Sequence, residues 1–339
     1  MPSADLPTPR GPITRWLFTH LCGGAAGPRP AVASADAGTD DDVQLALYCC
    51  YELHYRGFRG LDPELEWDLD VLALRADLEA CFLADVERSV DIVAPVSPRA
   101  AESCLQALAG GSDGPSLSAE VQHAASMEQV RELCIHRSAY QLKEADPHTW
   151  VIPRLQGEAK AATVEIQSDE YGDGDALAMH ARRFADTLRA VELDPTYGAY
   201  LDLLPGVTLA TTNLISLFGL HRRWRGALVG HLALFEMTSV GPMGRYADAL
   251  AQLGVGPEGR AFYEVHVEAD EEHQHVALER MVRGLLCDEP ELARDVVFGA
   301  TALTEIEGRF AHHLRTSWRE GRSSLRTSAE AEPVHAHTA

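Results

Sequence analysis

Basic residues are scarce in this chain of 339 residues. Lys and Arg total 29 against 51 Asp and Glu, which gives a formal net charge of −22. A protein that binds nucleic acid needs a basic surface to neutralise the phosphates. Docking on an anionic membrane needs positive charge in the same way. The composition therefore predicts neither a nucleic-acid partner nor a membrane partner.

The cysteines lack the pattern of a disulfide framework or of a zinc site. There are seven of them, irregularly spaced and without a CxxC pair. Such a set is typical of reduced thiols in a cytoplasm. The first residues, MPSADLPTPRGPITRW, also lack the apolar segment of a signal peptide. We therefore expect a cytoplasmic protein.

Long apolar runs and strand-like alternation are also missing. The most apolar stretch, residues 207–220, is too short to cross a bilayer and contains Thr and Asn. It is more typical of a buried helix. From Asp41 onward, apolar residues recur at the i, i+3, i+4 spacing of amphipathic helices, and no βαβ rhythm is present. The predicted fold class is all-α.

Composition and helix breakers divide the chain into four parts. Residues 1–40, rich in Pro, Gly, Ala and Asp, are expected to form an irregular arm, and residues 41–125 a helical extension. Residues 126–320 are expected to form the main bundle, and the polar residues 321–339 a disordered tail. Helices are expected at 41–55, 65–89, 127–144, 148–170, 176–191, 206–219, 223–238, 241–253, 256–286 and 291–317, with loops at 91–98 and 110–116.

The segment 256–286 carries an unusual density of metal-ligand side chains. At about 100° per residue, His266, Asp270 and His273 fall in one narrow, otherwise apolar sector, while His275 and several acids fall on the opposite side. Burying three titratable groups is unfavourable by several kcal/mol unless a partner such as a divalent cation compensates. We therefore predict that this helix forms one wall of a metal site. A buried charge relay without metal is the alternative.

Two Glu-x-x-His motifs suggest a different kind of metal site. They are Glu120-x-x-His123 and Glu272-x-x-His275. Ferritin-like di-iron proteins build their centre from such motifs on separate helices. However, Glu272 and His275 lie far from the apolar stripe of their helix, so we interpret them as surface residues.

A site for two metal ions needs ligands from neighbouring helices, and four residues are candidates. Glu236 lies in the apolar stretch HLALFEMTSV, where a carboxylate needs a partner. Glu170 ends one helix and His180 begins the next, so the Gly turn between them can bring the two together. Glu144 lies at the end of its helix. Taken singly, Glu144 could be a solvated helix end, Glu170 a turn cap with Glu165 as an alternative ligand, and His180 a core or surface residue.

Taken in order, the candidates resemble a known family. The set is Glu144, Glu170 within EYGDG, His180, Glu236 and then His266-xxx-Asp270-xx-His273. Over roughly residues 130–290 this pattern is similar to that of the haem-oxygenase-like di-iron oxidases, which are often described as iron-containing redox enzymes. The resemblance implies a haem-oxygenase-like helical bundle, which agrees with the all-α pattern, here with an N-terminal helical extension.

The resemblance also implies a cofactor and a division of ligands. It implies two iron ions, Fe(II) or Fe(III), with dioxygen as co-substrate and without haem. One iron would be bound by Glu144, Asp270 and His273 and the other by His180, Glu236 and His266, with Glu170 able to bridge. Independently, three His with several carboxylates suit iron or manganese better than a structural zinc ion.

Family activities include N-oxygenation of amino-acid-derived nitrogen, oxidative C–C cleavage of amino acids and decarboxylation of fatty acids. We therefore expect an oxidase of a small amino-acid-like or fatty-acid-like molecule, in specialised metabolism. An external electron donor and a homodimer are both compatible with this hypothesis. Two other classes stay open, namely a non-catalytic iron-binding protein and a metal-free helical bundle that acts as a hydrolase or binding module.

Overall fold

A computed structural model describes residues 4–92, 96–111 and 116–327. The described residues form helices and turns, and their one β-type pairing is an isolated bridge between Ala4 and Phe58. The all-α prediction is confirmed. Among these residues, no helix combines the length and the apolar character that crossing a membrane requires.

The main bundle is built around one long helix, α11. Its α-helices are α6 (Met127–Gln141), α7 (Asp146–Thr149), α8 (Gly157–Glu170), α9 (His180–Ala190), α10 (Gly206–Leu220), α11 (Arg225–Gln252), α12 (Pro257–His275), α13 (Arg283–Asp288) and α14 (Ala293–Arg319). A π-helical segment, Val276–Val282, joins α12 to α13. Short 3-10 turns lie at Pro63–Trp67, Ile152–Arg154, Gly172–Gly174, Leu201–Leu203, Arg222–Trp224 and Pro290–Leu292.

Glycine allows α11 and α14 to approach each other closely. A Cβ atom at Gly230 would lie 1.9 Å from the carbonyl oxygen of Val296, and one at Gly299 would lie 1.8 Å from that of Ala227. Only a residue without a side chain fits at such a backbone contact. This contact holds α11, which carries Glu236, closely against α14.

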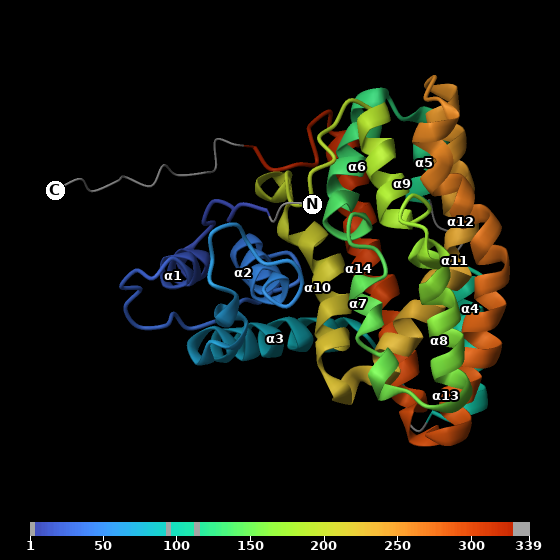
Figure 1. The fold of residues 1–339 in the computed structure, drawn as a ribbon, viewed down its shortest axis with the longest axis horizontal. Helices are drawn as coiled ribbons and strands as arrows, with labels where there is room; N and C mark the ends of the chain where they lie inside the picture. Colours follow the sequence, from blue (N-terminus) through green and yellow to red (C-terminus); the bar gives the residue numbers. More distant parts are fainter. Residues whose placement is uncertain (1–3, 93–95, 112–115, 328–339) are drawn as a thin grey trace.

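The N-terminal part forms a second group of helices beside the bundle (Figure 1), and it differs from the prediction at residues 12–21. Its helices are α1 (Pro12–Leu21), α2 (Asp41–Glu52) and α3 (Leu69–Ser89), and α2 packs on α10. The expectation of an irregular arm is wrong where α1 forms. Asp42 accepts hydrogen bonds from the backbone nitrogens of Ile13 and Thr14, at 2.8 and 2.9 Å. This cap comes from distant sequence, so local composition did not reveal it.

Two helices that we assigned to the extension pack instead on the bundle. They are α4 (Pro98–Ala109) and α5 (Leu117–Ala124), which lie against α11, and α4 also lies against α14. The predicted loops at 91–98 and 110–116 fall partly outside the described residues, as does the predicted tail from residue 328. Residues 321–327 are described, and Ser324 is buried with its hydroxyl 2.5 Å from Glu132. This start of the tail therefore packs on α6.

Helix boundaries differ from the prediction at two prolines. The segments 223–238 and 241–253 were expected to be separate, but α11 runs through Pro242. An internal proline is unfavourable by about 3 kcal/mol, and packing of α11 against α12 and α14 offsets that cost. Conversely, the predicted helix 148–170 is interrupted by a 3-10 turn at Pro153 before α8 begins.

Candidate metal centre

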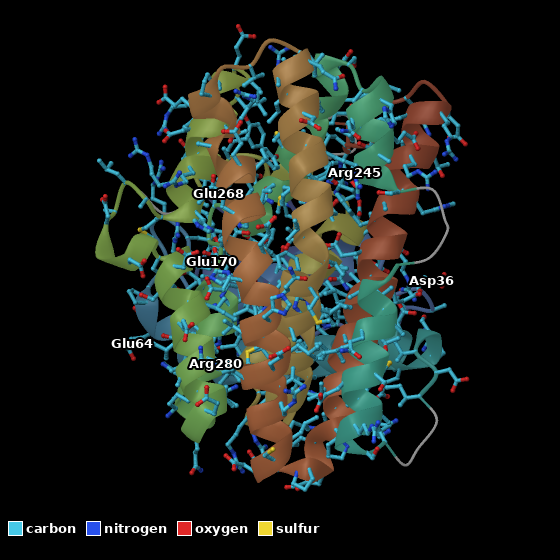
Figure 2. The ribbon with its side chains drawn as sticks, turned by 90° about the vertical axis from the view of Figure 1, so that its right-hand side faces the viewer. Asp36, Glu64, Glu170, Arg245, Glu268 and Arg280 are labelled. Carbon is cyan, nitrogen blue, oxygen red and sulfur yellow. The ribbon has the colours of Figure 1, made fainter. Side chains whose placement is uncertain are left out.

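Buried acidic and histidine side chains gather in two overlapping groups inside the bundle. In each group the potential ligand atoms lie within 4.8 Å of one another. The first group is Glu144, Glu170, His180 and His266, and the second is Glu170, Glu236 and His273. Glu170 belongs to both, and Figure 2 shows it about midway along the bundle. The structure thus brings together residues from five separate segments of the chain.

Helix α12 presents its donors as its sequence pattern predicts. His266, Asp270 and His273 are buried, whereas Glu272 and His275 are exposed. The exposure of these two residues removes the Glu-x-x-His motif of α12 from the site. The face assignment made from the sequence is therefore confirmed.

The ring of His266 is oriented by the backbone of its own helix. Its Nδ1 atom donates a hydrogen bond to the carbonyl oxygen of Phe262, at 2.7 Å. The Nε2 atom then carries the lone pair, and it lies 3.8 Å from Glu144 Oε1 and 3.9 Å from Glu170 Oε1. Fixing one ring nitrogen by a hydrogen bond and leaving the other free is typical of metal-binding histidines.

Asp270 extends the second group through its contact with His273. Asp270 Oδ2 accepts a 2.5 Å hydrogen bond from Ser239 on α11. His273 Nδ1 lies 3.5 Å from Asp270 Oδ1 and 3.4 Å from Glu236 Oε2. The other ring nitrogen, Nε2, lies 3.5 Å from Asp169. The sequence analysis did not select Asp169 or Ser239, and the adjacency of Asp169 to Glu170 was the one available signal.

A glycine turn joins Glu170 to His180, as expected. Gly172 has a φ of +69°, and a Cβ atom there would lie 2.6 Å from the backbone nitrogen of Met179. The turn therefore requires glycine. It places His180 Nδ1 2.8 Å from Glu170 Oε2, although the two atoms are not in hydrogen-bond geometry.

Glu144 is placed by a strained turn after α6. The next residue, Ala145, has a φ of +72°, which is unfavourable for a residue with a side chain. Strain of this kind persists where the surrounding structure imposes it, often at functional sites. Lys143, on the other side of Glu144, is buried and forms a 3.0 Å ion pair with Glu52 of α2. The extension thus holds the turn that carries a candidate ligand.

The protonation equilibria show that the carboxylates need positive charge. Burial raises the pKa of Glu144 well above its usual range, and the nearby charges of Glu170 and Asp270 raise it further. Burial likewise raises the pKa of Glu236 to about 8, although His273 acts in the opposite direction. Burial also disfavours ionised Glu170, but the surrounding histidines outweigh this and lower its pKa. Burial thus outweighs the positive charges near Glu144 and Glu236, so both carboxyl groups favour the protonated form.

The donor atoms fit a pair of metal ions. Several of them are buried and make no hydrogen bond within the described structure; they are both carboxylate oxygens of Glu144, Glu170 Oε2, His180 Nδ1, Asp270 Oδ1 and His273 Nδ1. Buried polar atoms that make no hydrogen bond are rare and unfavourable. Four carboxylates would balance two divalent cations in formal charge, and the mixture of oxygen and imidazole donors suits iron or manganese.

The grouping differs from the division that the family resemblance implied. Glu144 lies with His180 and His266 rather than with His273, and Glu236 lies with His273. Glu170, for which the resemblance implied a bridging role, belongs to both groups. Sequence order does not reveal which helix ends meet, so the pairing of ligands required the fold.

A hydrogen-bonded pair of histidines lies beside the centre. His148, which lines the same small cavity as Glu144 and Glu170, has its Nε2 atom 3.2 Å from His231 Nδ1. Its other nitrogen lies 3.4 Å from the hydroxyl of Tyr140. Burial lowers the pKa of both histidines, to about 3 for His231. These shifts favour the neutral form of both histidines. The sequence analysis missed them because an isolated His in a helix carries no distinct signal.

Comparison with known families gives an independent result. A family model described as "Iron-containing redox enzyme" matches residues 131–308, which is slightly more than half of the chain. The match begins in α6, ends in α14 and contains all seven candidate ligands. It confirms the haem-oxygenase-like helical fold. The comparison with curated proteins gave no match.

Proposed function

Because the chain belongs to the family of iron-containing redox enzymes, we propose that it is an oxidase that uses dioxygen and a non-haem di-iron centre. The observation that carries this proposal is the pair of buried donor groups that share Glu170. A single metal ion does not account for seven inward donor residues, and Asp270 extends the second group through its contact with His273. Glu144, His180 and His266 would hold one iron, and Glu236, Asp270 and His273 the other.

The protein residues orient the donors and exclude water. When bound, the irons supply the electrons with which dioxygen is activated. Phe262 fixes the ring of His266 through its carbonyl group, and Ser239 fixes Asp270 through its hydroxyl. The rings of Tyr140 and Phe235 line the small cavity at the carboxylates and cover them with apolar surface. A dry, preorganised set of donors strengthens the electrostatic interactions within the site.

We further propose that the substrate is a small amino-acid-like or fatty-acid-like molecule. N-oxygenation, C–C cleavage and oxidative decarboxylation are the reaction types that fit a centre of this kind. We place the reaction in the cytoplasm and in specialised metabolism, with an external electron donor wherever the substrate does not supply all the electrons. The acidic composition favours neither nucleic acid nor an anionic membrane as a partner.

The test is to load metal-free protein anaerobically with Fe(II) and then to expose it to O₂. We expect two irons per chain and a transient absorption band in the visible range. Replacement of His273 or Glu236 by Ala should abolish the band. His275→Ala changes an exposed histidine of the same helix and should retain it. An absent band in the native protein would contradict the proposal.

A non-catalytic iron-binding protein is distinguished by turnover. An oxidase consumes O₂ continuously once its substrate is present, whereas a storage protein stops when its Fe(II) is oxidised. Oxygen consumption should therefore be measured with a panel of amino acids and fatty acids, with products followed by mass spectrometry.

A further inference from the structure

A second, larger cavity adjoins the candidate metal centre. It has a volume of about 360 Å³ and lies between α5, α6, α11 and α14. Tyr140, Phe235 and Ser239 line both this cavity and the small one that contains Glu144 and Asp270. A cavity of this size is within the range of small-molecule sites. A molecule bound in it would therefore contact side chains that also line the cavity of the candidate metal ligands.

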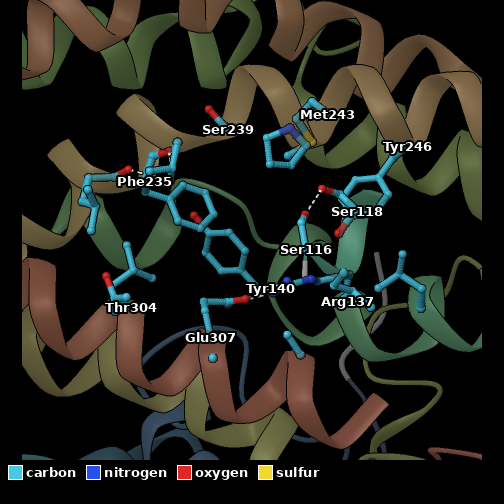
Figure 3. A pocket seen from close by; sticks show the side chains of 18 of the residues that line it. Ser116, Ser118, Arg137, Tyr140, Phe235, Ser239, Met243, Tyr246, Thr304 and Glu307 are labelled. Carbon is cyan, nitrogen blue, oxygen red and sulfur yellow. Dashed lines mark hydrogen bonds and ion pairs between the residues drawn. The ribbon is translucent and has the colours of Figure 1, made fainter. Parts of the chain in front are cut away.

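The wall between the two cavities is a pair of aromatic rings. The rings of Tyr140 and Phe235 meet edge to face, with their centroids 5.8 Å apart. Figure 3 shows both rings on the side of the cavity that Ser239 also lines. This end of the cavity therefore accepts the apolar part of a ligand.

The other end of the cavity is polar, because it contains one charged pair. Arg137 of α6 donates two hydrogen bonds to the carboxylate of Glu307 on α14, at 2.9 and 2.7 Å (Figure 3). Apart from this pair, the lining is mainly apolar, with residues such as Leu133, Leu234 and Met243. Arg137 and Glu307 together have no net charge, so this end of the cavity presents one cation and one anion side by side.

One further polar atom in the wall lacks a partner. Gln141 is buried, lines the cavity and follows Arg137 by four positions on α6, so both lie on the same face of the helix. Its Oε1 atom makes no hydrogen bond within the described structure. A buried acceptor without a donor points to a ligand that carries an N–H or O–H group.

From this arrangement we infer that the cavity binds a zwitterionic amino acid with a long apolar side chain. Its carboxylate accepts hydrogen bonds from Arg137, and its ammonium group donates to Glu307 and Gln141. A fatty acid is disfavoured because its single carboxylate would meet the carboxylate of Glu307 without a compensating ammonium group. The inference rests on the proposed function, and it selects one of the two substrate classes named there.

The position of the charged pair also orients the ligand. Arg137, Glu307 and Gln141 line the larger cavity only, whereas Tyr140 and Phe235 line both cavities. The charged head therefore lies away from the candidate metal ligands, and the apolar side chain extends towards Tyr140 and Phe235. The carbon chain, not the amino group, is the part of the substrate nearest to the centre.

Three probes of equal chain length test the inference, and binding to metal-free native protein is measured by calorimetry. They are L-2-aminooctanoic acid, octanoic acid and octylamine. The zwitterion should bind at least about tenfold more tightly than either probe with a single charge. Octanoic acid binding as tightly as the zwitterion, or no binding of any probe, would overturn the inference.

Two substitutions make the test specific to the charged pair. Glu307→Gln keeps the shape of the side chain and should reverse the preference, so that octanoic acid binds more tightly than the zwitterion. Gln141→Leu should weaken the binding of the zwitterion and of octylamine but not that of octanoic acid. The matched control is Glu305→Gln, which changes a carboxylate of α14 that pairs with Arg309 and does not line the cavity. An unchanged preference in Glu307→Gln would show that the pair is structural only.

The binding assay tests the ligand class separately from the proposed function. It uses protein without metal, so its outcome does not depend on iron or O₂. A missing Fe(II)-dependent band would contradict the oxidase, whereas a missing zwitterion preference would contradict only the ligand class.

Discussion

Glu170 occupies a special position among the candidate ligands, since it lies in both donor groups. Its neighbours differ on the two sides, with His180 and His266 on one side and Glu236 and His273 on the other. A bridging carboxylate would contact both ions, whereas each of the other donors would contact one. The substitutions should therefore have unequal effects on metal content.

The first prediction concerns the number of ions bound. Glu144→Ala and Glu236→Ala should each reduce the Mn(II) content from two ions per chain to one. Glu170→Ala should weaken both sites. Metal analysis after equilibrium dialysis provides the measurement, with Glu272→Ala, an exposed acid of α12, as the control. Equal losses in all three ligand variants would contradict the two-group arrangement.

The second prediction concerns Ser239, which touches a candidate ligand without being one. Its hydroxyl donates to Asp270 Oδ2 at 2.5 Å, and loss of such a supporting bond typically lowers metal affinity by about 10–100-fold. Ser239→Ala should therefore weaken Mn(II) binding to this extent while both ions still bind at saturation. Thr163→Ala is the matched control, because its buried hydroxyl bonds to the backbone oxygen of Ala159 alone among the described groups. A similar loss of affinity in both variants would show that the hydrogen bond from Ser239 to Asp270 does not specifically support metal binding.

At the scale of elements, the contact between α2 and the end of α6 connects the extension to the centre. The ion pair of Glu52 and Lys143 is fully buried, and Tyr197 donates a 2.6 Å hydrogen bond to the same Glu52 oxygen. Lys143 also lies over the ring of Tyr55, 4.3 Å from its centroid. Because Lys143 directly precedes Glu144, this pair supports the strained turn at Ala145.

The third prediction follows from that contact. Glu52→Leu leaves Lys143 buried without its counter-ion and should lower the free energy of unfolding by about 3–5 kcal/mol. The double variant Glu52→Leu with Lys143→Met removes both charges and should recover most of this loss. Denaturant unfolding measures the stability, and Mn(II) titration measures the site. Affinity should fall in the single variant and return in the double variant.

Recovery of stability without recovery of affinity would have a different meaning. It would show that the charge of Lys143 acts on the metal site directly rather than through the turn. A single variant as stable as the native protein would contradict the contact itself.

The elements also show which local patterns the sequence could predict. The inward face of α12 was predictable because helical periodicity alone separates His266 from His275. The cap of α1 by Asp42 and the continuity of α11 through Pro242 were not, because both depend on contacts with distant residues. The cavity beside Arg137 and Glu307 was not predictable either, since 170 positions separate the two residues.

At the scale of the whole molecule, the fold gathers seven separate donor residues into two overlapping groups. The sequence indicated which residue types face inward, and the family resemblance supplied their order. The pairing of Glu144 with His180 and His266 depends on how helix ends meet, and it differed from the prediction. Because these donors include several buried carboxylates, the stability of the folded protein should depend on pH.

The fourth prediction is that metal-free protein loses stability as pH rises from 6.5 to 8. Burial raises the pKa of Glu236 to about 8 and that of Glu144 well above its usual range. A raised folded-state pKa contributes stability that is full below the unfolded value and is lost as pH rises through the folded value. Neighbouring carboxylates also raise the pKa of His273 to about 10, although burial opposes them, and this acts in the same direction.

His180 acts in the same direction within this window because, although burial opposes this, the charge of Glu170 raises its pKa above the ordinary 6.5. His148, His231 and Glu170 act outside the window. Burial lowers the pKa values of His148 and His231, so their contribution changes below the ordinary value of 6.5. Glu170 has a lowered pKa, and its stabilising contribution is lost only as pH falls below its ordinary value of 4.5. Glu236→Gln, which cannot ionise, should accordingly show a smaller loss of Tm between pH 6.5 and 8 than the native protein.

Metal ions should reverse the effect. Binding requires ionised carboxylates, so saturating Mn(II) displaces the protons of Glu144 and Glu236 and supplies the missing positive charge. An ion at about 100 times its Kd stabilises the folded state by about 2.7 kcal/mol. Scanning calorimetry should therefore show a gain in Tm with Mn(II) that is larger at pH 8 than at pH 6.5. A gain that is equal at the two pH values, or larger at pH 6.5, would show that metal binding does not displace protons from these carboxylates.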